Sequence, residues 1–227
     1  MIDDSRAIVL ANARPAPVPL VPEIEVYQSP DFVALWERLC RAAPVGVPAP
    51  PPPYWATAWA GGQALARYLL DRPEIVRGRR VLDFGAGSGV VAIAAARAGA
   101  AAVIATDIDP VACAALELNV QHNVARGALA PTASIEVVAG DWIGRELPAI
   151  DVDLGGDVLY EGPMAARLTP WLRALAGQGI EVLIADPGRN YRPESGCSRL
   201  EVIAVPCEPA IESADVGETQ ILQLHSS

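Results

Sequence analysis

Apolar and polar residues follow two periods along this chain, and from residue 54 onward the two alternate. Short apolar runs of strand length are separated by longer stretches in which apolar residues recur every three or four positions. Strands are expected at residues 80–84, 102–107, 134–139 and 180–186, with a further one ending near residue 157. Helices are expected at residues 55–70, 90–98, 110–124 and 164–175, and two β-rich runs, RLEVIAVPC and TQILQLH, close the chain. This alternation predicts a largely parallel sheet built from βαβ units.

The first fifty residues have a different pattern. Prolines that exclude a helix and favour extended backbone stand at Pro15, Pro17, Pro19 and Pro22. The run DFVALWERLCRA predicts a helix with Asp31 as its N-cap, because its apolar residues share one helical face. Residues 44–54, PVGVPAPPPPY, are typical of a polyproline linker. We therefore predict an N-terminal helical and proline-rich appendage over residues 1–50 and one α/β domain over residues 51–227.

Composition narrows the class of protein. The chain has 227 residues and is 52% hydrophobic, which suits a globular domain rather than a disordered one. Its net charge of −10 argues against a nucleic-acid partner, because phosphate binding requires a basic surface. Two histidines and four scattered cysteines offer neither a metal site nor a disulfide framework. The start MIDDSRAIVL lacks the apolar stretch of a signal peptide, and no membrane span is evident, so a cytoplasmic location is expected.

The run VLDFGAGSGVVAIAAARAG, residues 81–99, has the strand–turn–helix layout of a nucleotide-type cofactor site. Glycines let the turn approach a ligand closely, and the following helix points its partly positive N-terminus at it. A dinucleotide-binding turn has the spacing G-x-G-x-x-G/A. Here the spacing is G-x-G-x-G, and Asp83 precedes the first glycine by two residues. An acid in that position suits a ligand with an ammonium group, although the turn alone leaves the kind of nucleotide open.

Acidic residues also follow the next two predicted strands. Asp107 lies 22 residues after Gly85 and is placed to accept hydrogen bonds from both hydroxyls of a ribose. Asp141, in GDW, is placed to accept from an adenine amino group, with Trp142 beside the ring. Carboxyl ends of parallel strands meet at one edge of the sheet, so these acids are expected to lie near Asp83. An acid at an ammonium, one at a ribose and one at an adenine together describe S-adenosylmethionine.

The motifs VLDFGAGSG, ATDIDP and GDW resemble those of the class I, seven-stranded S-adenosylmethionine-dependent methyltransferases. The resemblance covers most of residues 54–227. It implies a doubly wound, Rossmann-like α/β sheet whose last strand, TQILQLH, runs antiparallel. It also implies a set of cofactor-binding residues: Asp83, Gly85, Ala86, Gly87, Gly89, Asp107, Ile108, Asp141 and Trp142.

The end of the fourth strand, DLGGDVLYEG, is where the residues that select the methyl acceptor are expected. It lacks the N/D-P-P-Y/F motif of enzymes that methylate amide or exocyclic amino nitrogens. Instead it offers catalytic candidates in Asp157, Tyr160 and Glu161, and a carboxylate near an aromatic ring suits a cationic acceptor. Lysine fits, but its neutral amine is the nucleophile, so we assign Asp157 to orientation rather than to proton removal. Asp157 as a cap or ion-pair partner and Tyr160 as plain packing remain alternatives.

Further motifs resemble one branch of the family 16 protein-lysine methyltransferases, the electron-transfer flavoprotein β-subunit lysine methyltransferases. They are D-x-x-Y at residues 157–160, PPPYWATAWAGGQALARYLL, PLVPEI and ADPGR. The resemblance implies that Trp59 lies over the cofactor and that Gly156 contacts it through its backbone. Trp55 and Trp59 also fit a plain apolar helical face, since they are four residues apart. For Arg189, in ADPGR, two interpretations stand: contact with an acidic part of a protein substrate, or a plain surface position.

The resemblance implies a protein-lysine N-methyltransferase that acts on the electron-transfer flavoprotein β subunit. A ribosomal stalk protein is a second candidate partner, and a methyltransferase for a ribosomal protein or a small amine is an alternative. An NAD-dependent oxidoreductase is disfavoured by the glycine spacing, and an inactive scaffold by the intact set of acids. His122 and His225 are interpreted as structural or exposed, and Asn119 and Asn123 as residues that close their helix.

Overall fold

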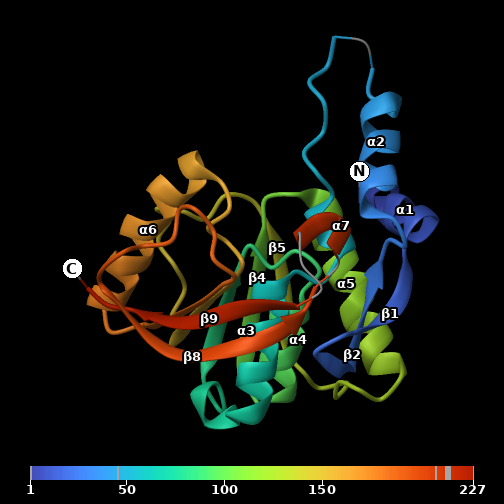
Figure 1. Cartoon of the computed structure of the whole chain (residues 1–227). Helices are drawn as coiled ribbons and strands as arrows, with labels where there is room; N and C mark the ends of the chain where they lie inside the picture. Colours follow the sequence, from blue (N-terminus) through green and yellow to red (C-terminus); the bar gives the residue numbers. More distant parts are fainter. Residues whose placement is uncertain (1, 45, 208, 213–215, 227) are drawn as a thin grey trace.

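The computed structural model describes residues 2–44, 46–207, 209–212 and 216–226. Its centre is a seven-stranded sheet in the order β5-β4-β3-β6-β7-β9-β8 (Figure 1). The strands are β3 (Arg80–Phe84), β4 (Ala102–Asp107), β5 (Ile135–Ala139), β6 (Val152–Gly156), β7 (Glu181–Asp186), β8 (Cys197–Pro206) and β9 (Val216–Leu224). Neighbours from β5 to β7 pair in parallel, whereas β9 runs antiparallel to both β7 and β8. The predicted doubly wound sheet with an antiparallel last strand is confirmed.

Helices cover both faces of this sheet. They are α3 (Ala60–Asp71), α4 (Val90–Arg97), α5 (Pro110–Ala125) and α6 (Gly162–Gly177). Side chains of β3 alternate between the faces. Val81 packs into a buried cluster with α3 and α4, and Leu82 into a second one with α6. Both faces are thus apolar, which is why β3, β6 and β7 are almost continuously buried.

The predicted helix over residues 55–70 is wrong in its first turn. A 3-10 helix, η1 (Tyr54–Ala56), comes first, and Thr57 is extended with φ −147° and ψ 161°. The α-helix begins only after Trp59, which occupies the N-cap position. The break places Trp55 and Trp59 on separate elements, so they do not form the single helical face that their spacing allows.

The N-terminal residues form an α-helix, a hairpin and a second helix. These are α1 (Ile2–Asn12), β1 (Arg14–Val18), β2 (Val21–Gln28) and α2 (Phe32–Ala42). The hairpin confirms the extended backbone expected from the prolines, and Asp31 caps α2 by accepting a hydrogen bond from Ala34 N (2.8 Å). The pattern did not predict α1, which lies against α5 (Figure 1). Apolar residues of β2 pack on α4, and those of α1 and α2 pack beside Trp55 and α5.

Two buried asparagines of α5 attach β2 to the domain. The Asn119 side-chain oxygen accepts from Tyr27 N (2.7 Å), and Asn123 accepts from Glu25 N (3.2 Å) and donates to Glu25 O (2.6 Å). Both side chains are fully buried, and α5 continues past them to Ala125. The interpretation that they close the helix is therefore wrong, because they hydrogen-bond to the backbone of β2. His122 is structural as interpreted, with its Nε2 at 2.7 Å from Glu25 Oε2.

The described residues between α2 and η1, 43–44 and 46–53, contain neither helix nor strand, as expected of a linker. Trp36 of α2 donates to Pro50 O (3.2 Å) and holds this segment beside the helix (Figure 1). The division into an appendage and a domain near residue 50 stays a prediction. None of the helices in the described part of the chain combines the length and apolar character of a membrane span.

Candidate active site

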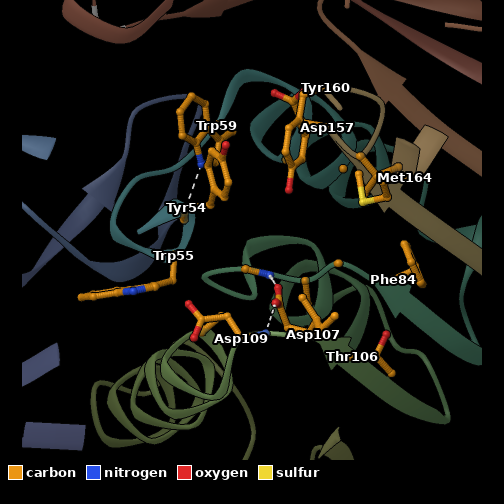
Figure 2. Close-up of a pocket in the computed structure, with 18 of the residues that line it drawn as sticks. Tyr54, Trp55, Trp59, Phe84, Thr106, Asp107, Asp109, Asp157, Tyr160 and Met164 are labelled. Atoms are coloured by element: carbon orange, nitrogen blue, oxygen red, sulfur yellow. Dashed lines mark hydrogen bonds between the residues drawn. The ribbon is translucent and has the colours of Figure 1, made fainter. Parts of the chain in front are cut away.

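The carboxyl ends of β3, β4 and β6 open onto a cavity of about 650 Å³ (Figure 2). Small-molecule sites have volumes of roughly 300–1,000 Å³, so the size of this cavity suits a small-molecule ligand. The predicted site residues that line it are Trp59, Asp83, Gly85, Ala86, Gly87, Asp107, Ile108, Asp141, Gly156, Asp157, Tyr160 and Glu161. Apart from Trp59, they lie at or just after the ends of β3, β4, β5 and β6, where the strand-end argument expects them.

The glycine turn forms one wall of the cavity. Gly85 and Gly87 have φ values of 63° and 53°, which glycine adopts without strain. Ala86 N donates to Thr106 O (2.9 Å), and this bond fixes the turn against the end of β4. A Cβ on Gly87 would meet no protein atom within 4 Å, because this glycine faces the cavity rather than the core. The turn thus leaves room for a ligand beside its backbone.

Gly89 differs from the other two glycines. It caps α4 with φ 78°, and a Cβ there would lie 2.5 Å from Leu116 Cγ. It is not among the residues that line the cavity. Its structural role is close packing of the turn on α5. A direct contact between Gly89 and a cofactor stays a prediction, and the position of Gly89 outside the cavity lining does not favour it.

Asp83 is buried at the end of β3, with 1% of its surface exposed. Its Oδ2 accepts from Ala92 N (2.9 Å) in the first turn of α4. Burial raises the pKa of this carboxyl group, and Asp153 nearby acts in the same direction. A cation brought into the cavity would favour the ionised form. Asp83 therefore anchors α4 and also offers a carboxyl group suited to a positively charged ligand.

Asp107 connects the glycine turn to the end of β4. Its Oδ2 accepts from Gly87 N and its Oδ1 from Asp109 N, both at 2.9 Å. Burial raises the pKa of this carboxyl group against the effect of these amides. A carboxylate has about four acceptor sites, so capacity remains toward the cavity for hydroxyl donors. Ile108 follows at the rim with 71% of its surface exposed.

Asp141 and Trp142 are placed differently from one another. Asp141 lines the cavity and accepts from Ile143 N (3.0 Å) and from Arg167 of α6 (2.7 Å), and the arginine lowers the pKa of its carboxyl group. Trp142 packs against the apolar cluster under α6 and is absent from the cavity lining, where Ile143 stands instead. Ile143 is thus the better placed of the two to contact an adenine ring.

Asp157 sits where β6 ends and has φ 68°, a left-handed conformation that is costly for a non-glycine residue. Its N–H donates to Ala185 O (3.0 Å), and its side chain is 3% exposed. The start of α3 abuts it: a Cβ on Gly61 would lie 2.6 Å from Asp157 Cβ. Packing of α3 on the end of β6 therefore holds this residue in its strained conformation.

Both carboxylate oxygens of Asp157 are bound by one guanidinium group. Arg189 Nε lies 2.7 Å from Asp157 Oδ1, and its terminal nitrogen lies 2.6 Å from Oδ2. This pairing raises the pKa of Arg189. Asp157 is thus an ion-pair partner, which was one of its alternative roles. Arg189 is neither free for an acidic part of a substrate nor at a simple surface position, because it is paired with Asp157. The signal was available, because ADPGR follows β7 and the carboxyl end of β7 lies beside that of β6.

Aromatic rings close the cavity on the side of Asp157. The rings of Tyr54 and Tyr160 lie with their centroids 4.9 Å apart and their planes tilted by 49°, and Trp59 Nε1 donates to Tyr54 O (2.8 Å). Figure 2 shows these rings and Asp157 on one side, with Asp107 and Asp109 opposite. Burial raises the pKa of both tyrosines, which keeps their hydroxyls neutral. Sequence reasoning missed Tyr54, although it directly precedes Trp55 in PPPYW.

Known proteins are similar in sequence to this chain over more than half of its length. The electron transfer flavoprotein beta subunit lysine methyltransferase of Xenopus laevis is 40% identical over 185 residues, covering 81% of this chain and 70% of that protein. The chain belongs to this family. The Danio rerio member of the electron transfer flavoprotein beta subunit lysine methyltransferase family is 47% identical over 140 residues. That match covers 61% of this chain and 52% of the fish protein, so the chain spans about half of that relative.

Two further comparisons show similarity to other methyltransferases. The pattern of the family "Ribosomal protein L11 methyltransferase (PrmA)" matches residues 63–143, which include the glycine turn and the ends of β3, β4 and β5. Magnesium protoporphyrin IX methyltransferase of Synechocystis PCC 6803, solved with bound SAM, superposes with a TM-score of 0.53. At 16% identity, over 72% of this chain and 80% of that one, this shows a shared methyltransferase fold.

Proposed function

We propose that this chain is an S-adenosylmethionine-dependent protein-lysine N-methyltransferase that acts on the electron transfer flavoprotein β subunit. The observation that supports it best is a single cavity with two kinds of wall. A glycine turn with Asp83 and Asp107 forms one, and Asp157 with Tyr54 and Tyr160 forms the other. Cofactor and acceptor sites are thereby adjacent, as a direct group transfer requires.

The residues of the first wall fit S-adenosylmethionine. The open side of Gly87 leaves room for it. Asp83 offers a buried carboxyl group to the cation of this ligand, and Asp107 offers a partly buried one to its ribose hydroxyls. Asp141 and Ile143 would meet the adenine, and Trp59 and Gly156 would complete the enclosure. When bound, this cofactor supplies a methyl group on a positively charged sulfur, which a neutral amine accepts.

The residues of the second wall fit a lysine side chain. Deprotonating a free lysine at pH 7 costs about 4–5 kcal/mol, and removal from water lowers that cost. Tyr54 and Tyr160 supply ring surfaces that shield the amine from water. Asp157 orients it by accepting an N–H hydrogen bond, and Glu161 stands at the same wall. These groups position a nucleophile and do not need to remove its proton.

The names of the relatives support the choice of protein substrate. The family is named for the flavoprotein β subunit, and the match over residues 63–143 is to a family named for ribosomal protein L11. A net charge of −10 favours encounter with a lysine-bearing basic surface. The four cysteines are free thiols, which agrees with a cytoplasmic location. The flavoprotein subunit is the substrate we favour, with a ribosomal protein as the second candidate.

A transfer assay with tritiated S-adenosylmethionine tests this proposal. Purified enzyme is incubated with recombinant electron transfer flavoprotein, with ribosomal protein L11, and with a lysate from cells that lack the enzyme. Label on lysines of the β subunit is the expected result. Label on L11 alone would support protein methylation but contradict the flavoprotein β subunit as the substrate. No label on any protein, despite calorimetric binding of the cofactor, would contradict protein methylation.

A further inference from the structure

Arg189 is held between two carboxylates at the acceptor wall. It binds both oxygens of Asp157 in a parallel pair, and its terminal nitrogen also lies 3.3 Å from Glu212 of α7 (Pro209–Glu212). Side-chain exposure is 3% for Asp157, 26% for Arg189 and 10% for Glu212. The guanidinium carbon lies 6.0 Å from the centre of the Trp59 ring. Such a buried bidentate pair is geometrically specific.

The backbone beneath Arg189 is fixed as well. Asp186 Oδ1 accepts from Gly188 N (2.6 Å) and from Arg189 N (2.9 Å), which closes the turn after β7. The side chain therefore projects from a rigid turn toward the end of β6. Among the described residues, Arg189 is the one cation that contacts Asp157. The pairing is thus a built feature of the site and not a chance surface contact.

The charge of this pair matters for an acceptor amine. An unpaired buried carboxylate stabilises an ammonium group, and an ammonium nitrogen has no lone pair to accept a methyl group. With Arg189 bound, Asp157 and its partner carry no net charge together. The carboxylate still has free acceptor sites for an N–H bond from a neutral amine. The pair can therefore orient an amine without holding its proton.

A further cation, Arg192, acts on Asp186 beside the pair. The other titratable groups around the pair carry no positive charge. They are Tyr54, Asp107, Tyr160, Glu161, Asp186, Cys207 and Glu212. Burial raises the pKa of Tyr54, Tyr160 and Cys207, so these three side chains stay neutral near pH 7. Arg167 is engaged with Asp141. Glu212 is the nearest opposing charge, because it contacts the guanidinium group itself.

We propose that Arg189 is a positioning residue that keeps the acceptor amine neutral by neutralising Asp157, with Glu212 moderating its charge. This inference rests on the proposed lysine methylation and adds a role that the motif residues alone do not give. Arg189 acts through Asp157 and takes no part in the bond that forms. Substitution of Arg189 should therefore change the pH dependence of methyl transfer rather than lower its rate equally at every pH.

The test is the pH dependence of single-turnover methyl transfer to the recombinant β subunit with saturating S-adenosylmethionine. The rate is expected to rise with pH as the amine loses its proton. In Arg189→Gln the acidic limb should move to higher pH by about one unit or more, which is roughly a tenfold loss near neutrality that alkaline pH restores. Arg189→Lys, which keeps a cation, should stay closer to the wild type.

Glu212→Gln gives a prediction of opposite sign. Removing the charge behind Arg189 should move the acidic limb to lower pH, by less than the Arg189→Gln shift. Arg199→Gln, which removes one positive charge from an exposed position on β8, is the matched control and should leave the limb in place. Thermal unfolding of each variant establishes that it is folded. If Arg189→Gln does not fold, the direction of the shift in Glu212→Gln still tests the inference.

Two results would overturn the inference. An equal loss of rate at every pH in Arg189→Gln would make the residue merely structural, and a limb that Glu212→Gln moves upward would contradict the charge argument. Absence of transfer by the wild type at any pH is a different failure, because it overturns the proposed function and this inference with it. A shifted limb in an active variant supports both.

Discussion

Asp153 is an acidic residue that the candidate chemistry does not use. It lies in the middle of β6 with no exposed surface, and neither carboxylate oxygen has a hydrogen-bond partner among the described residues. Its neighbours across β3 and β7 are Leu82 and Val182. Burial alone raises the pKa of Asp153 to about 8. A residue of this kind costs stability whenever it ionises.

Asp153→Asn should stabilise the protein, and increasingly so as pH rises. The pKa in the folded state exceeds the unfolded value of about 3.9, so the contribution of Asp153 to stability is greatest below that value and is lost as pH rises toward 8. The variant lacks this loss. The gain should approach about 1.4 kcal/mol per pH unit within this window. Urea unfolding at pH 4.5 and 8 measures it, and an equal difference at both pH values would refute the assignment.

At the scale of elements, the contact between α3 and the end of β6 shapes the acceptor wall. Gly61 and Gly62 are consecutive in α3 but face different surroundings. A Cβ on Gly61 would lie 2.6 Å from Asp157 N, whereas one on Gly62 would meet nothing within 4 Å. The close approach of backbone to backbone leaves no flexible side chain to move aside.

Gly61→Ala should therefore destabilise the protein by about 1–3 kcal/mol through overpacking. Gly62→Ala in the same helix should be neutral or stabilising by up to about 1 kcal/mol, because alanine favours the helix. Urea unfolding of the two variants compares them directly. Equal effects of the two substitutions would show that α3 does not pack on Asp157 as described.

The sequence predicted the elements of the sheet better than the contacts between them. Strands 80–84 and 102–107 were placed without error, since each is a short apolar run bounded by turn residues. The positions of Asp83, Asp107, Asp141 and Asp157 at one cavity followed from the strand-end rule. The helix start at Ala60 did not, because the break at Thr57 lies within an apolar run.

The sequence analysis did not predict contacts between two distant segments. The Asp157–Arg189 pair joins residues 32 apart through the adjacency of β6 and β7. Asn119 bonds to Tyr27, 92 residues away, and nothing in the helical pattern distinguishes it from a capping residue. Trp142 follows Asp141 directly, yet it packs under α6 because the loop turns there.

At the scale of the whole molecule, the N-terminal elements share buried apolar clusters with the helices α4 and α5. Leu35 of α2 packs in one cluster with Trp55 and Ala115 of α5, and Ile24 of β2 packs in another with Ile93 of α4. Both α4 and α5 begin at the cavity, where they follow the glycine turn and Asp107. A ligand bound at these helix starts is thus linked to the stability of the entire fold.

S-adenosylmethionine should accordingly raise the unfolding free energy of the protein. At a concentration 100 times its dissociation constant, mass action predicts a gain of about 2.7 kcal/mol. Thermal unfolding with and without the cofactor measures the effect, and NAD serves as the control because the glycine spacing does not suit it. Stabilisation by NAD in place of S-adenosylmethionine would contradict the cofactor assignment.

The most direct test of the central claim separates cofactor binding from methyl transfer at Asp157. Asp157→Asn keeps the size of the side chain but removes its charge. Calorimetry is expected to give an affinity for S-adenosylmethionine close to that of the wild type, while mass spectrometry of β-subunit lysines shows at least about a 100-fold slower methylation. Unchanged methylation by the variant, or lost binding of the cofactor, would contradict the role given to Asp157 as the residue that positions the acceptor amine.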